Sequence, residues 1–259
     1  MTADVIDRTA AVPGGSISIL EGGAGRPLLV LHPAGGAGAW MPYHEMLAQH
    51  FRVIAPDSPG FGRSAQIESV EGVDDLAFLY ADLIAKMGLQ DPMVLGFSFG
   101  GWVAAELAVL APELISRLVL VDAIGLRVPG APIADQFAMG PQEKIAALFH
   151  DPAAAADLFP ENPDLDTLTA FYRDETAFAR YAWSPFCCNP KLAKRLYRIS
   201  APTLVLWGGD DRLVPLSHGE KYAAMIPDAE LQVIPDAGHA VLMERPKEAV
   251  QAIVRFLER

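Results

Sequence analysis

The residues best suited to chemistry in this 259-residue chain form the pentapeptide Gly96-Phe97-Ser98-Phe99-Gly100. It matches the pattern G-x-S-x-G and lies between an apolar run at 93–95 and a helix-patterned stretch at 102–110, which is the context that the motif requires. A serine on such a sharp turn adopts a strained backbone, and the flanking glycines leave room for it. The turn sets the Phe99 N–H at the start of a helix, where it favours an oxyanion. The pattern therefore predicts Ser98 as a nucleophile.

A serine hydroxyl is a poor nucleophile without a base, so a histidine must come from elsewhere in the chain. His239 follows the apolar run 231–234, and a strand-end loop is where a doubly wound sheet places its working groups. His32 ends another apolar run in a glycine-rich turn, and we expect it to hold that loop together. We expect His44, His50 and His218 at the surface.

A carboxylate should hold the imidazole in the correct tautomer. Two predicted strand ends offer one, Asp122 and the pair Asp210 and Asp211. Either choice gives the chain order Ser, Asp, His. Spacing alone leaves the choice open.

The elements that must position these groups alternate along the chain. Short aliphatic runs predict strands at 17–20, 28–31, 52–55, 93–95, 118–121, 203–206 and 231–234. Several are continuously apolar, as strands covered on both faces are, and amphipathic stretches at 73–87 and 246–257 predict helices between them. This alternation predicts an α/β fold with a doubly wound, mostly parallel sheet.

The alternation lapses at about 124–199, where Pro, Gly and scattered aromatic residues accompany helical pieces. We interpret this stretch as a helical cap inserted between two strands, with 1–123 and 200–259 forming the core domain. Four basic residues within it interleave with apolar ones and predict the solvated face of a helix; they are Lys191, Lys194, Arg195 and Arg198.

Composition excludes several classes of protein. The formal net charge is −12, which argues against a nucleic-acid or anionic-membrane partner. Neither a secretory signal nor an apolar run of membrane-spanning length is present, so we expect a cytoplasmic protein with a small-molecule substrate. Self-association into a homo-oligomer is left open.

The two cysteines, Cys187 and Cys188, are adjacent and are expected to be free thiols. No metal and no organic cofactor is expected, because no zinc-like cluster and no phosphate-binding lysine motif is found.

Several motifs together resemble the α/β-hydrolase superfamily, in its compact bacterial form with a helical cap. They are His32–Gly36, Asp57–Ser64, Gly96–Gly101, Trp207–Pro215, and Gly238-His239 followed by Glu244-Arg245-Pro246. They occur in the family's order and cover nearly the whole chain.

The resemblance implies Ser98 as nucleophile, His239 as base and Asp211 as acid, because Asp211 directly precedes the Arg-x-Val-Pro segment. Asp122 is the reserve, since some relatives place the acid at that earlier strand end. The resemblance also implies that the backbone amides of Ala34 and Phe99 form the oxyanion hole. Pro33 replaces the glycine that usually follows the loop histidine, but the expected donor is one residue later.

The serine argues against the dehalogenases and epoxide hydrolases of this superfamily, which use an aspartate, and Ala34 argues against perhydrolases. Relatives that cleave carbon–carbon bonds in ring-fission products share the Asp-Arg-x-Val-Pro and cap layout. They usually carry Asn before the nucleophile and Trp after the histidine, where this chain has Phe97 and Ala240. We therefore expect hydrolysis of a carboxylic ester, or of a lactone or thioester. Carbon–carbon hydrolysis and a receptor that binds without turnover are the alternatives.

An apolar pocket beneath the cap is expected to hold a small to medium-sized substrate. Its candidate residues are Leu126, Phe137, Phe149, Trp183, Phe186 and Ala240, beside Phe99.

Overall fold

Eight strands form one sheet in the computed structural model, which describes residues 4–155 and 163–259. The strands are β1 (Ile6–Val12), β2 (Gly15–Gly22), β3 (Pro27–Leu31), β4 (Arg52–Pro56), β5 (Met93–Phe97), β6 (Arg117–Val121), β7 (Thr203–Gly208) and β8 (Ala229–Ile234). Their order is β1-β2-β4-β3-β5-β6-β7-β8. The six strands from β3 to β8 are parallel, and β2 is antiparallel to both β1 and β4. The expected mostly parallel sheet is confirmed.

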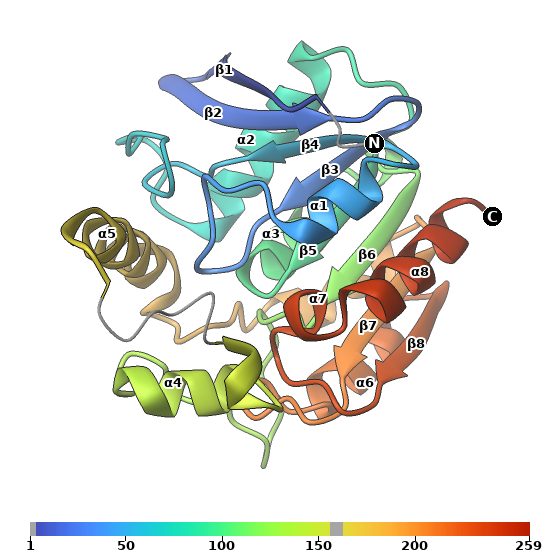
Figure 1. Cartoon of the computed structure of the whole chain (residues 1–259). Helices are drawn as coiled ribbons and strands as arrows, with labels where there is room; N and C mark the ends of the chain where they lie inside the picture. Colours follow the sequence, from blue (N-terminus) through green and yellow to red (C-terminus); the bar gives the residue numbers. More distant parts are fainter. Residues whose placement is uncertain (1–3, 156–162) are drawn as a thin grey trace.

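Helices cover both faces of the sheet, as Figure 1 shows. On one face lie α1 (Pro42–Leu47), α7 (Val241–Glu244) and α8 (Pro246–Leu257); on the other lie α2 (Val73–Lys86), α3 (Phe99–Leu110) and α6 (Ser217–Met225). Within β3, Leu28 and Val30 join the first of these two cores, whereas Leu29 and Leu31 join the second. Successive side chains of a strand point to opposite faces, so a strand covered on both sides must be apolar at every position.

One strand was not predicted. β1 lies at the edge of the sheet, pairs only with β2, and includes Asp7, Arg8 and Thr9. Ile6 remains 58% exposed. An edge strand that faces solvent needs no apolar run, so its sequence carries no strong strand signal.

The segment between β6 and β7 crosses the carboxyl ends of the parallel strands (Figure 1). Its described parts contain α4 (Pro141–Leu148), η2 (Pro152–Ala155), α5 (Leu165–Ala182), η3 (Leu192–Lys194) and η4 (Leu196–Arg198), where η denotes a 3₁₀ turn. The prediction of a helix that bears the four basic residues is wrong, because the structure has two 3₁₀ turns there, η3 and η4. Leu192 and Leu196 are nevertheless buried and the four basic residues exposed, as the pattern indicated. None of the described helices has both the length and the apolar character needed to cross a membrane.

Candidate active site

Ser98 occupies the turn between β5 and α3 with a left-handed backbone, φ 52° and ψ −109°. A side chain at φ > 0 is strained, and such strain persists only where the surroundings impose it. Two glycines permit the turn. A Cβ on Gly96 would lie 2.3 Å from the carbonyl oxygen of Gly100, and a Cβ on Gly100 would lie 2.1 Å from that of Leu31. The start of α3 therefore packs backbone to backbone against β3 and β5, which fixes Ser98 in place.

The structure brings Ser98, His239 and Asp211 together from the ends of β5, β8 and β7. His239 Nε2 lies 2.7 Å from Ser98 Oγ, and His239 Nδ1 lies 2.8 Å from Asp211 Oδ2. A carboxylate can only accept, so Nδ1–H is the donor and Nε2 is free to accept the hydroxyl proton. The other oxygen of Asp211, Oδ1, accepts the N–H groups of Leu213 (2.9 Å) and Val214 (2.7 Å). This geometry allows a proton to move from the hydroxyl to the imidazole.

The two other candidate acids lie elsewhere. Asp122 is fully buried, its Oδ1 accepts the N–H of Gly208 (2.8 Å), and its Oδ2 has no hydrogen-bond partner among the described residues. Burial raises the pKa of Asp122 well above its ordinary value, and the charge of Asp211 raises this pKa further. This rise in pKa favours the neutral form of Asp122, which stabilises an imidazolium less well than an anion does. Asp210 is exposed, and its Oδ2 lies 2.9 Å from Nδ1 of His150.

The loop after β3 lies beside the start of α3, because a Cβ on Gly100 would also lie 2.6 Å from the carbonyl oxygen of His32. His32 is buried and holds this loop, as expected. Its Nδ1–H donates to the carbonyl of Pro33 (2.6 Å), and its Nε2 accepts the N–H of Ser58 (3.0 Å). Burial lowers the pKa of His32, which agrees with a neutral ring. Phe99 is the first residue of α3, so its N–H has no carbonyl in a preceding turn of the helix.

Aromatic rings extend from Phe99 into the segment between β6 and β7. Ring centroids of Phe99 lie 5.5 Å from Phe61, 5.6 Å from Phe178 and 5.9 Å from Tyr181. The ring of Phe178 lies 5.2 Å from that of Phe137. Sequence reasoning missed Phe61, Phe178 and Tyr181. Phe178 and Tyr181 lie three positions apart on α5 and so share one face of the helix. This helical periodicity is the sequence signal that could have identified them.

The remaining pocket candidates differ in their exposure. Leu126, Phe149 and Ala240 are buried, and Phe186 is half-buried, 6.2 Å from Phe137 between ring centroids. Trp183 also contacts Phe137, at 5.4 Å, but remains 63% exposed.

The prediction that His44 and His218 lie at the surface is wrong. His44 Nδ1 accepts the N–H of Met41 at the start of α1, and burial lowers the pKa of His44 to about 3. His218 Nε2–H donates to the carbonyl of Ala131 (2.8 Å) and ties α6 to the segment after β6. Both are structural residues. Neither contact follows a sequence pattern.

One group of side chains in the described part of the chain offers three metal-type donor atoms within 4.8 Å of one another. Its members are His150, Asp210 and Asp236. The two carboxylates are exposed, and Asp210 Oδ2 lies 2.9 Å from His150 Nδ1.

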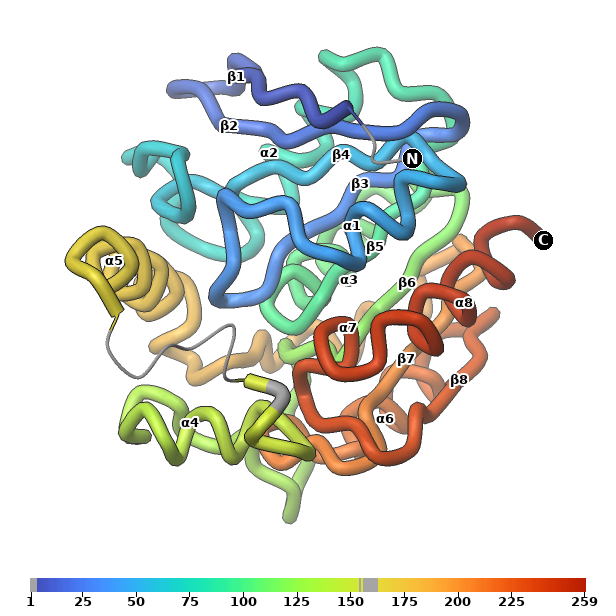
Figure 2. Tube along the Cα trace, viewed as in Figure 1, coloured from blue at the N-terminus to red at the C-terminus, as the bar shows by residue number. Residues whose placement is uncertain are grey.

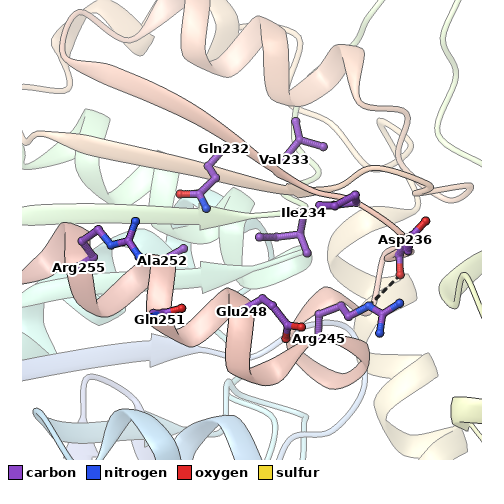
Figure 3. Close-up of a pocket in the computed structure, with 10 residues that line it drawn as sticks. Gln232, Val233, Ile234, Asp236, Arg245, Glu248, Gln251, Ala252 and Arg255 are labelled. Atoms are coloured by element: carbon purple, nitrogen blue, oxygen red, sulfur yellow. Dashed lines mark hydrogen bonds between the residues drawn. The ribbon is translucent and has the colours of Figure 1, made fainter.

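The three residues Ser98, His239 and Asp211, called the triad below, are buried. Ser98 is 4% exposed and His239 is 3% exposed. An open groove of about 480 Å³ lies instead between β8 and α8, lined by residues that include Asp236, Arg245 and Glu248 (Figure 3). No triad residue lines this groove. Ser98 and His239 thus lie in the interior, away from this groove.

Comparisons with known proteins identify the family of this chain. Residues 28–252 match the family described as "Alpha/beta hydrolase family". The chain is 32% identical to a 2-hydroxy-6-oxo-6-phenylhexa-2,4-dienoate hydrolase of Burkholderia cepacia, over 86% of this chain and 84% of that protein. A serine hydrolase involved in carbazole degradation superposes with a TM-score of 0.77 at 27% identity, covering 98% of this chain and 99% of the other. A thermophilic esterase superposes with a TM-score of 0.73 at 27% identity, covering 98% of both chains. The chain belongs to the alpha/beta hydrolase family.

Proposed function

We propose that this chain is a serine hydrolase that cleaves a carboxylic ester, or a lactone or thioester, of a small to medium-sized apolar substrate. The observation that carries the proposal is the unbroken pair of hydrogen bonds from Asp211 through His239 to Ser98. Three groups from distant parts of the chain meet in the order that nucleophilic catalysis needs.

The proposed reaction has two halves. Ser98 Oγ attacks the acyl carbon while His239 Nε2 takes the hydroxyl proton, and Asp211 stabilises the imidazolium. The N–H groups of Phe99 and Ala34 hold the oxyanion. His239 returns the proton to the leaving alcohol, which leaves an acyl ester on Ser98. Water then attacks this ester, gives one proton to His239, and the carboxylic acid departs as Ser98 regains its proton.

The segment between β6 and β7 is proposed to act as a cap over this site, with 124–199 as its limits and 1–123 and 200–259 as the core. Its α5 supplies Phe178 and Tyr181 to the rings around Phe99. Tyr181 OH also donates to the carbonyl of Pro59 (3.0 Å), which holds α5 against the core. An apolar acyl or alcohol group fits this surrounding better than a charged one.

Carbon–carbon hydrolysis is the second candidate, because the Burkholderia cepacia relative is named as a hydrolase of 2-hydroxy-6-oxo-6-phenylhexa-2,4-dienoate. A dienoate carries a carboxylate, and burying a carboxylate requires a cation or several N–H donors. Among the described residues of the segment between β6 and β7, the single buried Lys or Arg is Lys144, and it pairs with Glu175 at 2.7 Å. The aromatic surroundings of Ser98 therefore favour the neutral ester.

The decisive experiment combines labelling with a substrate panel. A serine-directed phosphonate is expected to label Ser98, located by mass spectrometry. Ser98→Ala is expected to lower kcat by about 10⁴–10⁶-fold. Ser69→Ala, at an exposed serine, is the control. The panel contains 4-nitrophenyl esters of increasing chain length, a lactone, a thioester and a 2-hydroxy-6-oxo-dienoate.

Rapid multiple turnover of the esters supports the proposal, and preference for the dienoate by more than about tenfold in kcat/KM would replace it with the second candidate. A single round of labelling without turnover would indicate a receptor instead. An adduct on any other residue, with Ser98→Ala fully active, would end the assignment of the nucleophile.

A further inference from the structure

The loop that carries His239 is held from several sides. It lies between β8 and α7, and Figure 2 shows it beside the end of α4. On the core side, Asp210 N–H donates to the carbonyl of Ala237 (2.9 Å). On the other side, Ala240 N–H donates to the carbonyl of Leu148, the last residue of α4 (2.8 Å).

One carboxylate joins these two sides. Glu244, the last residue of α7, accepts the N–H of Gly238 at Oε2 (2.6 Å) and the N–H of Asp151 at Oε1 (3.0 Å). Gly238 directly precedes His239, whereas Asp151 belongs to the segment between β6 and β7. Hydrogen bonds to a carboxylate are shorter and stronger than those between neutral groups.

The two backbones that Glu244 joins are in direct contact. A Cβ on Gly238 would lie 2.7 Å from both the nitrogen of His150 and the carbonyl oxygen of Leu148, and 2.8 Å from the carbonyl carbon of Phe149. Close-packed groups leave no room for independent movement. A shift of the chain at 148–151 therefore moves the backbone that orients His239.

We propose that Glu244 is a positioning residue for His239, acting through the N–H of Gly238, and that it locks the end of α4 to the same loop through the N–H of Asp151. The imidazole must meet Ser98 and Asp211 at the same time, and small misplacements of a reacting group cost large factors in rate. This role rests on the proposed function, because it gives the orientation of His239 its purpose.

The test compares three substitutions. Glu244→Gln keeps the shape and one acceptor oxygen but leaves one N–H without a partner and removes the charge. It is expected to lower kcat by about tenfold to hundredfold, with KM changed by less than about threefold. Glu244→Ala is expected to lose more, and Glu244→Asp, which keeps the charge on a shorter side chain, to recover part of the loss. Glu248→Gln is the control, because Glu248 is exposed in the groove of Figure 3.

Two further measurements separate positioning from stability. The first is the rate of phosphonate labelling of Ser98 per folded molecule, with folding followed by circular dichroism. The second is the low-field proton resonance of the His239 Nδ1–H bound to Asp211, which needs no substrate. Both are expected to change in Glu244→Gln and to be unchanged in Glu248→Gln.

An unchanged resonance and an unchanged labelling rate in Glu244→Gln would overturn the role of Glu244. So would a fall in kcat that only follows the loss of folded protein. A wild-type protein that shows the resonance but hydrolyses none of the panel would instead overturn the proposed function, while the resonance in the variant still decides the role of Glu244.

Discussion

Replacing Asp211 with Asn is expected to stop the reaction through the tautomer of His239. Asp211 Oδ1 accepts two N–H groups, from Leu213 (2.9 Å) and Val214 (2.7 Å), so an Asn must turn its own carbonyl oxygen toward them. Its NH₂ group then faces His239 Nδ1, which has to accept a hydrogen bond rather than donate one. The ring proton moves to Nε2, and no lone pair remains there for the proton of Ser98.

The expected loss in kcat is about 10⁴-fold, as for other triads with this change, or about 5 kcal/mol in transition-state free energy. Asp122→Asn is the matched control, because its Oδ1 still accepts the N–H of Gly208 (2.8 Å) and burial already favours the neutral form of the native carboxyl. We expect its kcat within about threefold of wild type, which is less than 1 kcal/mol. Asp210→Asn is expected to behave like this control, since Asp210 faces His150.

The assay is kcat on the fastest ester of the panel, with the fraction of active molecules titrated by the phosphonate and folding checked by circular dichroism. Retention of more than about a tenth of wild-type kcat by Asp211→Asn would contradict the tautomer argument. A large loss in Asp122→Asn, with Asp211→Asn nearly active, would move the acid to the end of β6.

Three other outcomes are expected. Gly100→Ala places a Cβ 2.1 Å from the carbonyl oxygen of Leu31 and is expected to lower the free energy of unfolding by more than about 4 kcal/mol. In the control Gly35→Ala the added Cβ meets nothing within 4 Å, so Tm should be nearly unchanged. Equal melting temperatures of the two variants would refute this reasoning. Because the pKa of Asp122 is raised by folding, the folded chain keeps a proton on this group that the unfolded chain loses above about pH 4. The contribution of Asp122 to the free energy of unfolding therefore falls as the pH rises above this value, about pH 4. The stability of Asp122→Asn relative to wild type should then increase from acid to neutral pH in urea titrations, and a constant difference would contradict the burial argument. Burial raises the pKa of Cys187 to about 12, so this thiol should react with Ellman's reagent only after unfolding; prompt reaction in the native protein would show that it is accessible.

The sequence predicted the parts of the fold whose signals are local. Continuous apolar runs identified the strands that are covered on both faces, and the glycines around Ser98 identified the turn, because each rule acts over a few residues. β1 was not predicted, because an edge strand needs neither an apolar run nor a special turn.

The candidate site was predictable where a residue follows a strand end, as Ser98 and His239 do. Spacing alone did not choose the acid, since Asp122 and Asp211 both follow parallel strands, and only the family resemblance indicated Asp211. What separates them is their surroundings: one carboxyl is buried beside a backbone N–H, and the other faces an imidazole. Glu244 belongs to a motif of the family resemblance, but its contacts were not predicted, because both of its partners are backbone N–H groups that every sequence possesses.

The position of β8 at the sheet edge affects how the protein loses activity in denaturant. β8 pairs only with β7, and its last residue lies five positions before His239. Regions with few buried apolar side chains open locally at a lower free-energy cost than global unfolding, and Ile234 is the single buried residue of β8. We expect such an opening of β8 to displace the imidazole of His239, and the turn at Ser98, between β5 and α3, to remain folded. Activity should therefore vanish at a lower urea concentration than the helical signal, and the intermediate should regain activity on dilution without refolding from the beginning.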